Sequence, residues 1–230
     1  KEIFEQPAVI AETLEGRIHK GRLLEQSFGH VAQELFDRTR AVQIIACGTS
    51  YHACLLGAYY FNQLAAVPAM PVLGPQFIEQ GGNSVGPEDV AVFVSQSGET
   101  KDVINAVEAA RERGMGVLDL VNVVGSTLTL ISDVHLPLVC GYEISVPATK
   151  TFLNQALLFL YLATGLAGRD PSRLQGVPDQ LARTLDVVDD SARRVAAYLE
   201  QWPAMHYLGY GITHPIALEA ALKLKEITYA

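Results

Sequence analysis

Five short apolar runs rich in β-branched residues alternate with helical patterns in this 230-residue chain. The runs cover residues 42–46, 69–73, 90–94, 117–121 and 134–138. Strands buried on both faces read as continuous apolar runs, and their alternation with amphipathic segments is typical of βαβ units. The pattern therefore predicts an α/β fold: a five-stranded parallel sheet of flavodoxin-like order 2-1-3-4-5, flanked by helices.

The helical patterns also indicate how the chain is organised. The first residues, 1–7, are polar, and we expect a helix from there to about residue 15, followed by helices at 23–37, 51–64, 102–113, 127–131, 149–166, 179–201 and 215–229. A further strand at 205–208, followed by the glycine turn 209–211, repeats the strand–turn–helix order seen about 160 residues earlier. We therefore expect a first domain over 1–167, a linker over 168–178, and the start of a second, homologous domain over 179–230.

A lone strand and helix cannot bury both faces of a sheet. We therefore expect the second unit to continue beyond Ala230 or to dock on another surface.

Composition excludes several classes of partner. The net charge is −8 and no basic run interleaved with aromatic residues occurs, so we expect no nucleic-acid partner. The longest apolar run, near 156–163, is too short to span a bilayer, so we expect no membrane partner. The three cysteines lack a paired spacing and, without a signal peptide, predict reduced thiols in the cytoplasm.

The stretch Ser95-Gln96-Ser97-Gly98-Glu99-Thr100 lies where the third apolar run passes into a helix. Unpaired N–H groups and the helix dipole favour an anion there, and hydroxyl groups add neutral donors. A single Ser or Thr at such a junction is most often only an N-cap. This cluster of polar side chains exceeds what a cap needs, so we expect it to bind a phosphate group.

A second turn, Cys47-Gly48-Thr49-Ser50, has the same position after the first apolar run. In the expected strand order the first and third strands are neighbours, so both turns face one crevice at the switch point of the sheet. Cys47 could be a nucleophile or a small wall residue of this pocket. The sequence places no histidine partner beside it, since His52 lies inside the next helix, and we favour the wall residue.

Three charged residues share one face of the last expected helix. At roughly 100° per residue, Glu219, Lys223 and Glu226 fall within about 60° of one another, in the middle of an apolar arc. Charges in such a place must be paired, and they are often functional. A catalytic general base and a structural buried ion pair are both possible, and we favour catalysis.

Four strings of this chain, in order, closely resemble one family. They are KEIFEQP at 1–7, ACGTSYHA at 46–53, SQSGET at 95–100 and LEAALKLKEITY at 218–229. The chain resembles the isomerase domain of the glucosamine-6-phosphate synthases (glutamine–fructose-6-phosphate aminotransferases), within the sugar isomerase (SIS) family. The resemblance implies SIS domains, a hexose 6-phosphate substrate, a homodimer, and no metal or organic cofactor.

The resemblance also implies roles for individual residues. Glu226 would move a proton between C1 and C2 of the sugar, assisted by Lys223 and Glu219, and Val146 and Ala148 would line the sugar. The sugar-phosphate cradle would consist of Cys47, Gly48, Thr49, Ser50, Ser95, Gln96, Ser97 and Thr100.

The chain departs from the family pattern in several places. Ala148 stands where the family usually has a serine, Tyr210 replaces an arginine, and Gln76 replaces an acidic residue. The family's ring-opening histidine and Schiff-base lysine would lie beyond Ala230, and its glutaminase domain is expected to be absent from this chain.

These departures keep two alternatives open. One is a stand-alone glucosamine-6-phosphate deaminase or fructosamine-phosphate deglycase. The other is a non-catalytic sugar-phosphate sensor, against which the charged trio argues.

Overall fold

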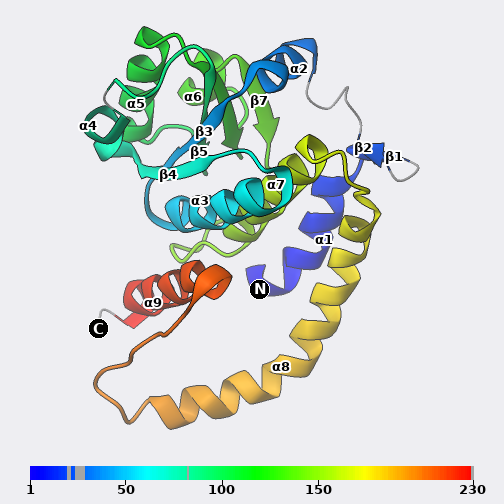
Figure 1. Cartoon of the computed structure of the whole chain (residues 1–230). Coiled ribbons are helices and arrows are strands. Elements are labelled where there is room, and N and C mark those ends of the chain that lie inside the picture. The colour runs from blue at the N-terminus through cyan, green and yellow to red at the C-terminus, as the bar shows by residue number, and fades with distance from the viewer. Residues whose placement is uncertain (20–21, 24–28, 82, 229–230) are drawn as a thin grey trace.

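A five-stranded parallel sheet forms the centre of the computed structural model, which describes residues 1–19, 22–23, 29–81 and 83–228 (Figure 1). Its strands are β3 (Ala41–Ala46), β4 (Ala69–Leu73), β5 (Asp89–Ser95), β6 (Gly116–Val121) and β7 (Val134–Pro137). Their order, β4-β3-β5-β6-β7, is the predicted 2-1-3-4-5, and every neighbouring pair is parallel. The α/β fold and its strand order are therefore confirmed.

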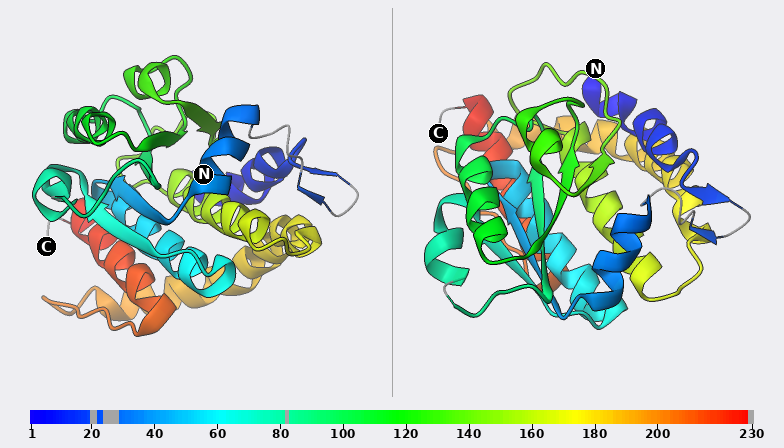
Figure 2. Two further views of the ribbon diagram at one scale, coloured as in Figure 1. Left: turned by 45° about the horizontal axis from the view of Figure 1, so that its top comes forward. Right: turned by 90° about the horizontal axis from the view of Figure 1, so that it is seen from above.

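Helices cover both faces of this sheet (Figure 2). One face packs against α1 (Glu2–Leu14), α3 (Gly48–Tyr60) and α7 (Lys150–Leu166). The other packs against α4 (Phe77–Gly81), α5 (Lys101–Glu112) and α6 (Thr127–Ile131). Successive strand residues point to opposite faces, so Ile44 belongs to the first core and Ile45 to the second.

The remaining elements are peripheral. They are the hairpin strands β1 (Ile18–His19) and β2 (Arg22–Leu23), α2 (Gly29–Arg38), a π-helical turn (Phe61–Ala65), and 3-10 turns at Gly74–Gln76, Ser172–Gly176 and Gly211–Thr213. The expected helix 23–37 corresponds to α2, and its first turn, 24–28, lies outside the described residues. No described helix is both long and apolar enough to cross a membrane.

The last quarter of the chain forms a long arm. Helix α8 (Val177–Leu199) leaves the body beside α1, and α9 (His214–Thr228) returns to pack against α3 (Figure 1). None of the residues of α8 is buried. Residues 205–208 form no strand, contrary to the expectation, because no described strand lies beside them to supply the backbone hydrogen bonds.

Candidate functional site

A cavity of about 220 Å³ lies at the carboxyl ends of β3 and β5. These strands are neighbours, and the strand order reverses between them, so the cavity occupies the switch point where ligands bind in open α/β sheets. Its walls are Cys47, Thr49, Ser50, Val94, Ser95, Gln96, Ser97 and Thr100. The two polar turns singled out in the sequence therefore bring all of the predicted cradle residues except Gly48 to one cavity.

The turn after β5 leaves its donors available. Thr100 occupies the N-cap position of α5, but its side chain makes no capping hydrogen bond. Instead the Thr100 and Ser95 hydroxyls pair at 3.1 Å, and Ser95 Oγ accepts the Gly98 N–H at 3.0 Å. Ser97 Oγ accepts the Glu99 N–H at 3.2 Å, so its own proton is free to donate. The geometry therefore does not favour the alternative in which these residues serve only as helix caps.

The turn after β3 is built in the same way. Cys47 is the N-cap of α3 without a side-chain capping bond, and Gly48 has a φ of +57°. Ser50 Oγ accepts a hydrogen bond from the Gln155 amide at 2.9 Å. Gln155 is completely buried in α7, and it orients the Ser50 hydroxyl so that its proton can donate into the cavity. Gln155 is a supporting residue that the sequence reasoning missed; its signal was a polar side chain inside an apolar helix.

The charged trio of α9 meets α3 beside this cavity. Thr49 donates to Glu219 Oε1 at 3.0 Å and accepts from Lys223 Nζ at 2.8 Å. Lys223 Nζ also lies 3.4 Å from Glu219 Oε1 and 2.6 Å from Glu226 Oε2. One cavity-lining hydroxyl therefore links the pocket to all three charged residues, directly or through Lys223.

His52 joins the same network. Its Nδ1 lies 2.7 Å from Glu219 Oε2. The sequence reasoning considered His52 only as a partner for Cys47 and so missed this contact. The signal was its spacing: three residues after Thr49, it lies on the same face of α3.

The two carboxylates of the trio differ in how deeply they are buried. The Glu219 side chain is 7% exposed and has Thr49, His52 and Lys223 as partners. The Glu226 side chain is 27% exposed, and within the described residues it forms its ion pair with Lys223. Glu219 therefore suits a positioning role, whereas Glu226 has the access that a proton-transferring group needs. The apolar neighbours of the trio, such as Leu218 and Ile227, are exposed rather than buried, because α9 packs mainly on α3.

Val146 and Ala148 lie apart from this cavity. They belong to the 138–149 loop, which joins β7 to α7, and neither lines the 220 Å³ space. The Val146 side chain is 81% exposed. Their contact with a sugar stays a prediction.

The three cysteines are free thiols. Burial raises the pKa of Cys47 despite a hydrogen bond from the Gly74 backbone, and burial raises the pKa of Cys140 to about 12. A thiolate is the reactive form, so the geometry favours Cys47 as a wall residue. Within the described ranges, no group of three or more His, Cys, Asp or Glu residues is arranged to hold a metal ion.

Comparison with known proteins agrees with the fold. Residues 34–165, more than half of the chain, match the SIS domain family. Over its whole length the chain is 39% identical to the glutamine–fructose-6-phosphate aminotransferase (isomerizing) of Pseudomonas putida and 41% identical to that of Aeropyrum pernix. It covers 39% and 38% of those two proteins, about two fifths of their length.

A solved structure gives the same result. The C-terminal domain of glucosamine-fructose-6-phosphate aminotransferase from Francisella tularensis superposes with a TM-score of 0.90 at 30% identity. The match covers 99% of this chain and 67% of that one. On the family match, the sheet order and the two polar turns, the chain belongs to the SIS domain family.

Proposed function

We propose that this chain is a sugar-phosphate isomerase domain of an isomerising glutamine–fructose-6-phosphate aminotransferase. The observation that carries the proposal is the placement of Thr49, which lines the 220 Å³ cavity and bonds to both Glu219 and Lys223. The names of the full-length matches at about 40% identity support it.

The phosphate is proposed to bind between the N-termini of α3 and α5. Backbone N–H groups and the hydroxyls of Ser50, Ser95, Ser97 and Thr100 would surround it with neutral donors. A net charge of −8 repels an anion at long range, so binding depends on these local donors.

Glu226 is proposed as the base of the isomerisation. Ammonia first condenses with the C2 carbonyl of open-chain fructose 6-phosphate, and the carbonyl oxygen leaves as water to give a C2 imine. Glu226 then takes a proton from C1, the electron pair of that bond forms a C1–C2 double bond, and the C2–N π electrons move to nitrogen. A proton then returns to C2, the hydroxyl proton at C1 passes to nitrogen, and an aldehyde remains at C1. The product is glucosamine 6-phosphate. Lys223 holds Glu226 at 2.6 Å, and Glu219 holds Lys223.

An activity assay tests this proposal. The full-length protein is incubated with fructose 6-phosphate plus glutamine or ammonia, and separately with glucosamine 6-phosphate alone. We expect glucosamine 6-phosphate to form in the first mixture. Ammonia release from the second mixture without synthesis in the first would show a deaminase instead, and binding without turnover would show a sensor.

The domain boundaries, the cellular location and the oligomeric state are also proposals. We propose a first SIS domain over 1–167, a linker over 168–178 and the start of a second SIS domain at 179–230; the family match over 34–165 supports the first. Free thiols support a cytoplasmic site, and the family resemblance supports a homodimer. Sedimentation of the full-length protein checks the dimer.

A further inference from the structure

The middle of the 138–149 loop is not held in place by apolar side chains of its own. Tyr142, Ile144 and Val146 are 93%, 88% and 81% exposed. Apolar side chains that stay in water contribute no burial energy. Something else must therefore fix the segment that carries the two predicted sugar contacts, Val146 and Ala148.

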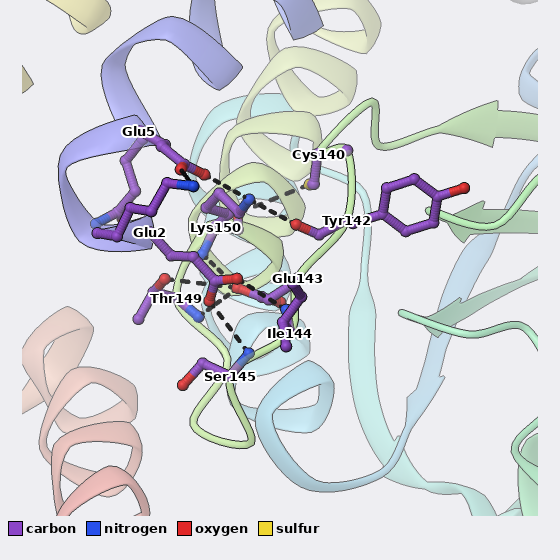
Figure 3. Close-up of polar contacts among 12 residues, drawn as sticks. Glu2, Glu5, Cys140, Tyr142, Glu143, Ile144, Ser145, Thr149 and Lys150 are labelled. Carbon is purple, nitrogen blue, oxygen red and sulfur yellow. Dashed lines mark hydrogen bonds and ion pairs between the residues drawn. The ribbon is translucent and has the colours of Figure 1, made fainter.

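Carboxylates accept hydrogen bonds from the backbone amides of this loop (Figure 3). Glu2, in the first turn of α1, accepts the Ile144 N–H at 2.8 Å and the Ser145 N–H at 3.3 Å. Within the loop, Glu143 accepts the N–H groups of Thr149 and Lys150 at 2.7 and 2.8 Å. Glu143 acts locally, whereas Glu2 ties the loop to a distant part of the chain.

A buried lysine makes the second tie to α1. The Lys150 side chain is 3% exposed, and its ammonium donates to Glu5 Oε2 at 2.9 Å and to the Tyr142 carbonyl at 2.8 Å. A buried cation is costly unless it is paired. The pairing explains why a lysine stands at the start of α7, where the helix dipole disfavours positive charge.

Glu2 and Glu5 act as one unit because they are three residues apart on a single helix face. Glu2 accepts hydrogen bonds in the middle of the loop, and Glu5 pairs with Lys150, the first residue after the loop. We name these two carboxylates with their loop partners Ile144, Ser145 and Lys150 the α1 clasp.

Open space lies next to the clasp. A cavity of about 630 Å³ is bounded by α1, the loop and the end of α9. Its walls include Glu2, Glu5, Ser145, Pro147, Thr149 and Ile227. The clasped loop and the end of α9, the helix that carries the proposed base, therefore adjoin the same space.

We propose that Glu2 and Glu5 are positioning residues that hold the 138–149 loop in place for the sugar, an inference that rests on the proposed function. They act through the loop backbone and Lys150, so they contribute equally to binding of substrate and transition state. Loss of the clasp should then raise KM for fructose 6-phosphate and leave kcat within about twofold.

The test compares Glu2→Ala and Glu5→Gln with Glu12→Ala in the full-length protein. Glu12 is exposed on the same helix and does not line the cavity, so it controls for the loss of a carboxylate from α1. Two quantities are measured: the rate of chymotryptic cleavage after Tyr142, identified by mass spectrometry, and KM with kcat for fructose 6-phosphate. We expect Glu2→Ala to raise both the cleavage rate and KM about tenfold, the scale of a lost charge-assisted hydrogen bond. Glu2→Gln, which retains one acceptor oxygen, should restore part of each.

The outcomes separate the clasp from the proposed function. Unchanged cleavage in Glu2→Ala and Glu5→Gln overturns the clasp, whether or not the protein is active. Faster cleavage with an unchanged KM overturns its role in sugar binding. If the wild-type protein does not turn over fructose 6-phosphate, the proposed function fails, and the cleavage rates alone decide whether α1 holds the loop.

Discussion

Thr49 is the residue that joins the two parts of the candidate site. Its hydroxyl donates a hydrogen bond to Glu219 and accepts one from Lys223, and the residue also lines the 220 Å³ cavity. The sequence pattern predicted Thr49 as a cradle residue and placed the trio on one helix face. It could not predict that they touch, because the contact depends on how α9 packs against α3.

Thr49→Val tests this junction. Valine keeps the volume but loses both hydrogen bonds, so Lys223 and Glu219 would be left with one partner fewer beside the cavity. We expect kcat/KM of the full-length enzyme to fall at least about tenfold, and Thr49→Ser, which keeps the hydroxyl, to stay near wild type. Equal activity of the valine and serine variants would remove Thr49 from the mechanism.

The state of Cys47 makes a second residue-scale prediction. Burial raises the pKa of Cys47, so the thiol stays protonated at neutral pH. It becomes a thiolate only when the pH rises above the pKa of an ordinary cysteine. Iodoacetamide should therefore modify Cys47 more slowly than free glutathione at pH 7, with a rate that climbs steeply in alkaline buffer. Mass spectrometry of the alkylated peptide measures this, and a rate equal to that of glutathione at pH 7 would point to an activated nucleophile.

At the scale of elements, the turn after β5 depends on one glycine. Gly98 has a φ of +70°, and a Cβ there would lie 2.0 Å from Ser126 Oγ. Both the left-handed backbone and the close approach exclude a larger residue.

Gly98→Ala should therefore lower the free energy of unfolding by about 2 kcal/mol or more and weaken sugar-phosphate binding. Gly125→Ala is the matched control: its φ is +81° but nothing lies within 4 Å of the added carbon, so only backbone strain, about 1 kcal/mol, applies. Urea unfolding measures both. Equal losses in the two variants would mean that the contact with Ser126 does not shape the turn.

The elements also show what the sequence could predict. The strands of the sheet were predicted to within a residue or two at each end, because the central strands β3, β5 and β6 are largely buried on both faces and apolar residues predominate in all five runs. The short helices over 74–81 were missed, since Gly74 and Pro75 have the pattern of a turn. The strand predicted at 205–208 was wrong, because an apolar run becomes a strand only where another strand pairs with it.

At the scale of the whole molecule, the return of α9 onto α3 assembles the candidate site. The cavity lies in the part of the chain that matches the SIS domain, and the trio lies more than fifty residues beyond that match. The periodicity of the last helix predicted that the trio shares one helix face. Only tertiary packing brings that face to Thr49. His52 was missed for the same reason: its partner, Glu219, is 167 residues away in the sequence.

The central claim is that the turns bind a sugar phosphate while Glu226 moves the proton. Glu226→Gln in the full-length protein tests both halves at once, since glutamine keeps the shape of the side chain but cannot act as a base. The measurement is turnover of fructose 6-phosphate together with the Kd for glucosamine 6-phosphate, with Glu12→Gln as the control. We expect turnover to fall by a factor of about a hundred or more while Kd changes by no more than about twofold. Turnover near the wild-type rate would contradict the central claim.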